Sequence, residues 1–575
     1  MLELLAPRED VVQTPRAVLH LLGRTLPGAT VRVGGEPVTV YATGVFARDG
    51  IPLAPGTNTL LVEAVTPDGQ TLTRSLRVER VPPDAPVQWP LNSLWLNGAS
   101  LRPAEALRVA PGEPVDVAVQ ATPGQRVEAR LPGQAWHALV ESASRPGHYA
   151  AALSFAETTD ETAAPVQLRI SAQALPRTAA RRSIVTVTPA EAGAWRPDPS
   201  RLLVVGAEGA ELVHGLHDVR LGGPFLAELP SGTLLRATGR RGEALRVQLA
   251  PDTTAWVARS AVAPAAAGTR AAHAAITSLT VAGSSEGDVL DIPLPAGVPV
   301  AIRVVADTRG AMQLQVEVFN AHHATSWITH HDSCRVVREV SAEQAGPGRV
   351  LLRVDPIAPR LWGWHSERTA SRLRITLHPV PRVADASQPL AGLRVALEPG
   401  HGGPTNLGAV GATGVPEKDV NRWTADALQA ELQSAGASVL MVREGDDNPT
   451  PRERARRVMD SRADLFVSLH ANATDTRNGF LRVAGTSTFY KHATGRDAAA
   501  AVLRRMLELT GLDDFGRVGN FNYAPIRLVT AMPAILVEQA FMSHPGDEAR
   551  LLDPAFRAIT ARAVRMGLED FLRSA

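Results

Sequence analysis

Residues 393–403 have the sequence LRVALEPGHGG, and the pattern of the chain changes at this stretch. From here onward, apolar segments that suit strands alternate with amphipathic segments that suit helices. We expect strands in LRVALEP, ASVLMVR, DLFVSLH, TSTFY and either IRLV or AILVE, and helices over 417–435, 450–461, 495–510 and 547–572. This alternation predicts a carboxy-terminal α/β domain over residues 389–575, with a mostly parallel sheet flanked by helices.

Residues 1–388 show almost no helical periodicity. Short runs rich in Val, Leu and Thr alternate there with Gly and Pro, which predicts all-β sandwiches and small barrels. We expect four units, over 1–82, 83–190, 195–267 and 270–388, with proline-rich linkers at 81–90, 190–200 and 381–389. The protein is therefore expected to be multidomain, with all-β modules preceding one α/β domain.

Two of these units resemble known bacterial modules. In the first, Thr30–Val33, Gly44–Phe46 and Gly56–Ala64 match the pattern of immunoglobulin-like sandwiches. In the third, SGTLLRATGRRGEALRVQL (231–249) followed by TAWVARSAV (254–262) resembles an SH3-like barrel. For Trp256 in that unit, core packing is favoured over stacking on a ligand. Such resemblances indicate fold and carry no function by themselves.

Composition excludes several classes of protein. Apolar residues make up 45% and charged residues 20% of the chain, as in ordinary soluble domains. The formal net charge of +1 provides no field that would draw the chain onto nucleic acid. Cys334 is the only cysteine, so no intrachain disulfide is expected. No apolar run reaches the ~18 residues of a membrane span, and the first residues, MLELLAPREDVVQTP, are too acidic for a signal peptide.

Four polar residues of the α/β domain lie where chemistry is expected. His401, His470 and Glu538 each follow or end an apolar strand, and Glu417 opens the first helix. Ligands gather at the carboxyl ends of strands in such sheets. Each histidine alone would be interpreted as an ordinary loop or core residue. Together with two carboxylates, they favour a hydrolytic zinc site, which keeps three protein ligands and one open position for water.

Three segments around these residues resemble the zinc-dependent N-acetylmuramoyl-L-alanine amidases. They are VALEPGHGGPTNLGAVGATGVPEKDVN (395–421), VREGDDNPTPRERARRVMDSRADLFVSLHAN (442–472) and PAILVEQAFMSHPGDEARL (533–551). The resemblance implies that His401, Glu417 and His470 bind one Zn²⁺ and that Glu538 is the catalytic acid/base. It also implies a catalytic role for Arg527, which would orient the substrate or Glu538.

The same resemblance gives roles to residues beside the site. Arg443, Asp446 and Arg454 are expected to form an ion-paired scaffold beneath it. Glu398 stands where the family has aspartate, and His544 stands where it has asparagine. We interpret His544 as a local cap or a substrate contact, with metal binding disfavoured. The short span between Asn472 and Glu538 predicts a site that is open without a partner protein.

Three other patterns are interpreted structurally. Ser285 lies in GSSEG (283–287), but a strand follows where a nucleophile elbow needs a helix, so it is expected in a turn. The histidines between His322 and His331, close to Cys334 and Trp327, could hold a metal, although a solvated β-loop is favoured. Trp362 and Trp364 are expected in a core, with sugar stacking as the alternative. Their region, 270–388, faintly resembles wall-targeting modules that precede amidases.

The resemblance implies an exported peptidoglycan hydrolase that cuts the amide between N-acetylmuramic acid and L-alanine. Its expected partners are the glycan strands and stem peptides, with envelope or divisome proteins as further candidates for the β-modules. Its expected location is the periplasm or cell envelope, with the signal segment absent from this chain. Two alternatives stay open: another zinc peptidase or amidohydrolase acting on wall peptides, and an inactive amidase fold that serves as a wall-binding structural protein.

Overall fold

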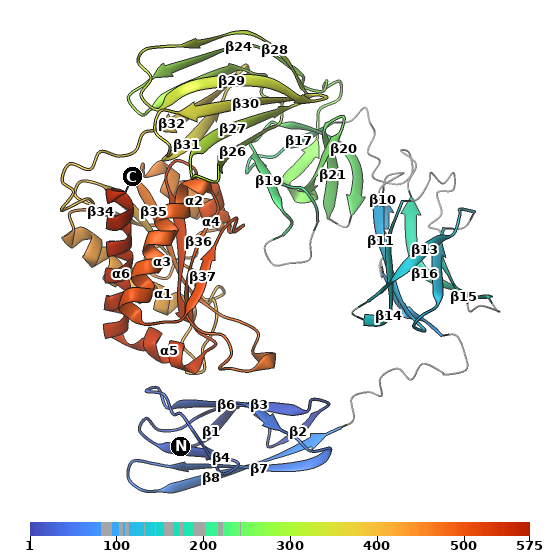
Figure 1. The fold of residues 1–575 in the computed structure, drawn as a ribbon, viewed down its shortest axis with the longest axis vertical. Coiled ribbons are helices and arrows are strands. Elements are labelled where there is room, and N and C mark those ends of the chain that lie inside the picture. The colour runs from blue at the N-terminus through green and yellow to red at the C-terminus, as the bar shows by residue number, and fades with distance from the viewer. Residues whose placement is uncertain are drawn as a thin grey trace.

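The computed structural model describes residues 1–81, 95–102, 107–109, 114–131, 133–143, 145–154, 165–171, 176–187, 202–216, 222–241 and 243–574. A long all-β region precedes one domain in which strands alternate with helices (Figure 1). The linkers predicted at 81–90 and 190–200 fall almost entirely outside the described residues. Within those residues, none of the helices has the length and apolar character needed to cross a membrane.

The amino-terminal unit (residues 1–80) packs two sheets around one core. Its strands are β1 (Glu3–Ala6), β2 (Val11–Thr14), β3 (Val18–Arg24), β4 (Thr30–Val33), β5 (Glu36–Val38), β6 (Val45–Pro52), β7 (Gly56–Val65) and β8 (Thr71–Arg80). One sheet has the order β1-β3-β6 and the other β2-β8-β7-β4-β5. Alternating apolar residues, such as Val31 and Val33 on β4, turn one face of each sheet inward.

The second and third units are also built from strands. The second contains β9 (Leu96–Arg102), β10 (Leu107–Val109), β11 (Pro114–Ala121), β12 (Arg126–Arg130), β13 (His137–Ser142), β14 (Arg145–Ser154), β15 (Pro165–Ser171) and β16 (Pro176–Val187). The third unit (residues 202–265) contains β17 (Leu203–Val205), β18 (Ala210–Val213), β19 (Phe225–Leu229), β20 (Leu234–Arg241), β21 (Ala244–Ala250), β22 (Thr253–Ala258), the 3-10 turn η1 (Arg259–Ala261) and β23 (Val262–Pro264). Trp256 on β22 is half-buried.

The fourth unit (residues 272–378) is a second pair of packed sheets. Its strands are β24 (Ala274–Gly283), β25 (Asp288–Pro293), β26 (Val300–Ala306), β27 (Met312–Phe319), β28 (Ala321–His330), β29 (Val337–Gly346), β30 (Arg349–Pro356), β31 (Gly363–Arg368) and β32 (Arg372–His378). Ser285 lies in the turn between β24 and β25, as predicted. His322, His323 and Trp327 are exposed on β28, and among the described residues this region forms no candidate metal group.

The amidase-like α/β domain (residues 389–574) has a central sheet of order β34-β33-β35-β38-β36-β37. Its strands are β33 (Arg394–Pro399), β34 (Ser438–Met441), β35 (Leu465–Asn472), β36 (Thr486–Tyr490), β37 (Asp514–Val518) and β38 (Ala534–Phe541). Its helices are α1 (Glu417–Ser434), α2 (Pro451–Asp460), α3 (Arg496–Thr510), α4 (Ala524–Leu528), α5 (Pro545–Leu552) and α6 (Pro554–Arg573), with 3-10 turns η2 (Thr476–Asn478) and η3 (Ala493–Gly495). All strand pairs are parallel except β36 with β38.

The α/β domain corrects the sequence prediction in three places. The helix predicted over 547–572 is two helices, because Pro554 has no amide hydrogen to continue α5 and Asp553 caps the first turn of α6 through Ala555 N. The first three residues of IRLV lie in the short helix α4 and Val529 directly follows it, so AILVE supplies the strand. The edge strand β37 was not predicted, since its sequence DFGRV has a central glycine and little apolar content.

Trp362 and Trp364 join the fourth unit to the α/β domain, and both are buried, as predicted. Trp362 stacks on Phe571 of α6 with a ring separation of 5.4 Å, and its Nε1 donates to Asp464 O over 2.9 Å. Trp364 enters the core of the fourth unit instead. Between them, Gly363 passes so close to Ala531 that a Cβ atom would collide with its backbone. The two rings therefore fill two different cores.

Trp362→Ala should destabilise the α/β domain by about 3–5 kcal/mol, because it leaves a cavity beneath Phe571. The loss is measured as a shift in denaturant midpoint followed by ellipticity at 222 nm, since the described α-helices lie in this domain. Trp327→Ala is the matched control: that ring is 63% exposed, and its removal should change stability by less than ~0.5 kcal/mol. Equal effects of the two substitutions would contradict the packing described here.

Candidate metal centre

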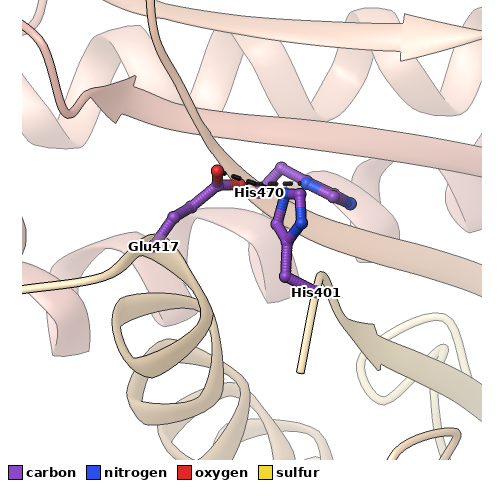
Figure 2. A group of neighbouring side chains, drawn as sticks. All are labelled: His401, Glu417 and His470. Atoms are coloured by element: carbon purple, nitrogen blue, oxygen red, sulfur yellow. Dashed lines mark hydrogen bonds and ion pairs between the residues drawn. The ribbon is translucent and has the colours of Figure 1, made fainter. Parts of the chain in front are cut away.

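Three side chains converge at the carboxyl edge of the sheet (Figure 2). His401 follows β33, Glu417 is the first residue of α1, and His470 lies near the end of β35. His401 Nε2 is 3.2 Å from Glu417 Oε2, and His470 Nδ1 is 3.0 Å from Glu417 Oε1. One potential ligand atom from each residue lies within 4.8 Å of the others. The structure thus brings together the three residues that the sequence predicted as metal ligands.

Glycines allow the backbone to come this close. A Cβ atom on Gly400 would collide with the ring of His470, and one on Gly408 would collide with Glu417 and His401. His401 itself adopts a left-handed conformation with φ of 62°, which is uncommon for a residue with a side chain. Such a conformation persists only where surrounding contacts hold it, and it is frequent at functional sites.

The protonation state of the cluster suits a cation. Burial opposes ionisation of Glu417, but its hydrogen bonds with His401 and His470 outweigh burial and lower its pKa. Its carboxylate also accepts from the backbone amides of Ala409 (2.9 Å) and Ala471 (3.1 Å). In the described structure, the buried His470 Nε2 has no hydrogen-bond partner.

The donor set therefore fits a divalent metal. Two imidazoles and one ionised carboxylate are ligands that Zn²⁺ prefers in catalytic sites. Asn406 Oδ1 lies 2.7 Å from His401 Nδ1, so it accepts the proton from that nitrogen and leaves Nε2 as the ligand atom. His401, Glu417 and His470 are accordingly the residues that could hold a metal here.

A buried ion pair supports the segment that carries His401. Arg454 and Glu398 have side chains 3% and 0% exposed, and Arg454 Nη1 lies 3.1 Å from Glu398 Oε1. Arg454 Nη2 donates to His401 O over 2.7 Å. Arg454 lies near the start of α2, and a capping box formed by Thr450 and Glu453 stabilises that end of the helix. The pair thus fixes the backbone of a candidate ligand.

The predicted scaffold beneath the site contains the expected residues, but not all of them form ion pairs. Arg454 is ion-paired, and Asp446 pairs with Lys418 at 2.8 Å. Arg443, although buried, donates to the backbone carbonyls of Pro399 (3.1 Å) and Lys418 (3.0 Å). Arg443 is therefore held by backbone carbonyl oxygens and not by the ion pair that was predicted for it.

Glu538 lies beside the cluster. It pairs with His470 in the parallel register of β35 and β38, so both side chains point to the same face of the sheet. Glu538 is partly buried, and its place on the central strand is fixed on both sides by β35 and β36. Glu538 therefore lies next to the candidate ligand His470 on the neighbouring strand.

Arg527 is placed elsewhere. Its guanidinium is 2.5 Å from Glu211 and 3.8 Å from Glu228, both in the third unit, and its side chain is 5% exposed. Burial raises the pKa of the Glu228 carboxyl, an effect that Arg452 and Arg527 oppose. The structure therefore gives Arg527 contacts between domains, and none of its described contacts is with Glu538 or the three candidate ligands.

His544 is a helix cap, as one of its two predicted roles required. Its Nδ1 accepts from Asp547 N over 3.2 Å at the start of α5. Tyr41 of the amino-terminal unit packs edge-on against its ring at 6.3 Å. In the same contact region, Asp49 accepts from the amides of Phe480 (2.9 Å) and Leu481 (2.8 Å). The amino-terminal unit thus touches the loops that leave this edge of the sheet.

Three residues around the cluster were missed by the sequence prediction. Tyr523 donates from its hydroxyl to Glu398 Oε1 over 3.3 Å and presents its ring edge-on to His470 at 5.4 Å. Burial and the Glu398 charge raise the pKa of Tyr523, so its hydroxyl keeps the proton it donates. Gln539 donates to both Asn421 and His470 O over 3.1 Å. Asn421 and Gln539 lie within the quoted segments 395–421 and 533–551, whereas Tyr523 lies in none of the three segments.

The fold and donor set first define a class: an α/β domain with a candidate metal centre at the carboxyl edge of its sheet. Comparison with known proteins then gives the family of this domain. Residues 395–570 match the model of the N-acetylmuramoyl-L-alanine amidase family. The carboxy-terminal third of the chain is thus an amidase domain of that family, and the amidase resemblance is confirmed.

The relatives named below match about a third of this chain. N-acetylmuramoyl-L-alanine amidase LytC of Bacillus subtilis is 29% identical over 185 residues, which cover 32% of this chain and 36% of LytC. The probable cell wall amidase LytH of Staphylococcus aureus is 31% identical over 211 residues, covering 36% of this chain and 65% of LytH. Among solved structures, amidase AmiC2 of Nostoc punctiforme is 29% identical, with a TM-score of 0.30, and the match covers 32% of this chain and 98% of AmiC2. The chain thus spans about a third of LytC and less than two thirds of LytH.

Arg454→Met should destabilise the amidase domain by about 3–5 kcal/mol, because it leaves Glu398 as an uncompensated buried charge. Arg456→Met, two residues further along α2, is the matched control. Its pair with Glu208 is 3.4 Å long and both side chains are more than half exposed, at 59% and 69%. That control should cost less than about 1 kcal/mol. Urea denaturation of both variants measures the difference, and similar losses would refute the buried pair's role.

Proposed function

We propose that the protein is a zinc-dependent N-acetylmuramoyl-L-alanine amidase. The observation that carries the proposal is the convergence of His401, Glu417 and His470 inside a domain of the amidase family. His401, Glu417 and His470 would hold one Zn²⁺. When bound, such an ion lowers the pKa of a water molecule and polarises the amide carbonyl.

The chain's own residues supply the remaining steps. Glu538 accepts a proton from the attacking water and returns it to the departing amine, because an amine anion is a poor leaving group. Asn406 keeps the proton of His401 on Nδ1, away from the ligand atom. Glu417 stays ionised between the two histidines, as its lowered pKa requires. Gln539 donates to the backbone carbonyl of His470 and is itself held by Asn421, which accepts from the same amide nitrogen.

The substrate and location follow from the same proposal. The substrate is peptidoglycan, whose glycan strands and stem peptides lie outside the cytoplasmic membrane, so the protein acts in the periplasm or cell envelope. We propose that the first and third units are immunoglobulin-like and SH3-like modules and that the fourth is a wall-targeting module. These modules are candidates for binding the wall or envelope and divisome proteins.

Metal content tests the site directly. The purified chain should contain about one zinc per molecule, and Glu417→Ala should lose it, because two imidazoles alone lack the charge that holds a divalent ion. Asp426→Ala on the same helix is the control, since that carboxylate is exposed and pairs only with Arg422 in the described contacts. Mass spectrometry of the metal content decides the matter: a zinc-free wild type, prepared without chelators, would rule the site out.

Digestion of purified sacculi tests the bond. The full chain, with no partner protein added, should release stem peptides that begin with L-alanine. Glu538→Gln should lower this rate by about 10²–10⁴-fold, because the proton can no longer be moved. Glu444→Gln, exposed at the same end of the domain, should keep the wild-type rate. Fragments cut between stem amino acids would favour a peptidase instead.

A further inference from the structure

The third unit holds the amidase domain at a small set of charged contacts. β18 supplies Glu211, and β19 supplies Phe225 and Glu228. Glu211 lies 2.5 Å from Arg527 and accepts from Asn522 over 2.9 Å. Glu228 lies 2.6 Å from Arg452. We call this set the clamp: Glu211, Phe225 and Glu228 on one side, with Arg452, Asn522 and Arg527 on the other.

The clamp is too well shielded to be an incidental surface contact. Arg527 is 5% exposed, and the Glu211 and Glu228 side chains are 31% and 24% exposed. The ring of Phe225 lies 5.2 Å from the guanidinium of Arg527 and 4.6 Å from Lys491 Nζ. Charges that are shielded from solvent interact more strongly than exposed pairs, and a fork-shaped guanidinium between two carboxylates fixes geometry as well as energy.

One arm of the clamp leads to His470. Asn522 is adjacent to Tyr523 in the chain, and Arg527 Nη1 also donates to Asn522 Oδ1 over 3.3 Å. The ring of Tyr523 lies against His470, and its hydroxyl is bonded to Glu398. The third unit therefore contacts Asn522, which directly precedes Tyr523 in the chain. The ring of Tyr523 in turn packs against the candidate ligand His470.

The other arm leads to His401. Arg452 lies on α2, two residues before Arg454, so both arginines belong to the start of that helix. Arg454 holds His401 O and pairs with Glu398. Glu398 thus receives hydrogen bonds from both arms, one through Arg454 and one through Tyr523. A shift of the third unit would move the supports of both histidines together.

We propose that the third unit is a positioning element of the metal centre, which acts through Glu211 and Glu228 on the segments that carry Tyr523 and Arg454. Arg527 is then a positioning residue and not a catalytic one. This inference rests on the proposed metal site but not on which bond is cleaved. It assigns the third unit a function inside the enzyme, in addition to any ligand that the unit binds.

The test measures zinc affinity in the full chain by competition with a chromogenic chelator. Glu211→Gln/Glu228→Gln should weaken zinc binding about tenfold, the lower end of what outer-shell substitutions cost at metal sites. Glu208→Gln is the matched control, because Glu208 joins the same two units through an exposed pair with Arg456. It should leave zinc affinity unchanged. Exchange of the pair, as Glu211→Arg/Arg527→Glu, should recover most of the affinity lost in Arg527→Glu alone.

The outcomes separate positioning from simple adhesion. If the double variant has a lower unfolding temperature and an unaltered zinc affinity, the third unit only adheres to the amidase domain and the proposal is overturned. A wild-type chain that binds no zinc overturns the metal site itself and the positioning role with it. Should the double variant fail to fold, Arg527→Lys decides in its place: it keeps the charge but loses the fork, so the same weakening is expected, and unchanged affinity refutes the proposal.

Discussion

The ionised carboxylate of Glu417 is the constraint around which the amidase domain is arranged. It is buried, yet it faces two histidines and accepts hydrogen bonds from Ala409 N, Ala471 N and the side chain of Asn421. Taking a carboxylate out of water costs several kcal/mol unless such partners are all in place. Its position at the first turn of α1 adds the favourable end of the helix dipole. The loop before α1 and the end of β35 must therefore meet at one point, and Gly408 and Gly400 make that approach possible.

The same requirement extends outward from the carboxylate. Arg454, Glu398 and Tyr523 form a second buried polar layer, and the members of such a layer stabilise the structure only when each has a partner. This layer is continuous with the contacts of Arg452 and Arg527 at the third unit. The boundary between domains is consequently part of the architecture of the site.

The sequence predicted the residues whose positions depend on local rules. His470 and Glu538 lie in the second halves of the apolar strands β35 and β38, and parallel strands bring such positions toward one edge of the sheet. Glu417 begins a helix that its periodicity revealed. Residues whose partners are distant left no such pattern: Asn522 and Glu211 are 311 positions apart, and the role of Tyr523 depends on Glu398, which is 125 positions away. Arg527 was interpreted through family motifs alone, which contain nothing of the third unit. The prediction missed the break at Asp553–Pro554, although the sequence contains a signal for it, because a proline after a good cap residue begins a new helix.

Glu398 shows how one departure from a family pattern can belong to a larger arrangement. The family resemblance places aspartate there, one methylene shorter. With the longer side chain, Oε1 lies 3.1 Å from Arg454 and 3.3 Å from the hydroxyl of Tyr523, so one oxygen serves both supports of the histidines. Oε2 has no hydrogen-bond partner among the described residues, so the carboxylate is held from one side. The position of Glu398 therefore depends on Arg454 and Tyr523 keeping their positions relative to each other. The clamp at the third unit anchors the two segments that carry those donors. Glu398 and the clamp therefore act together to position the supports of His401 and His470.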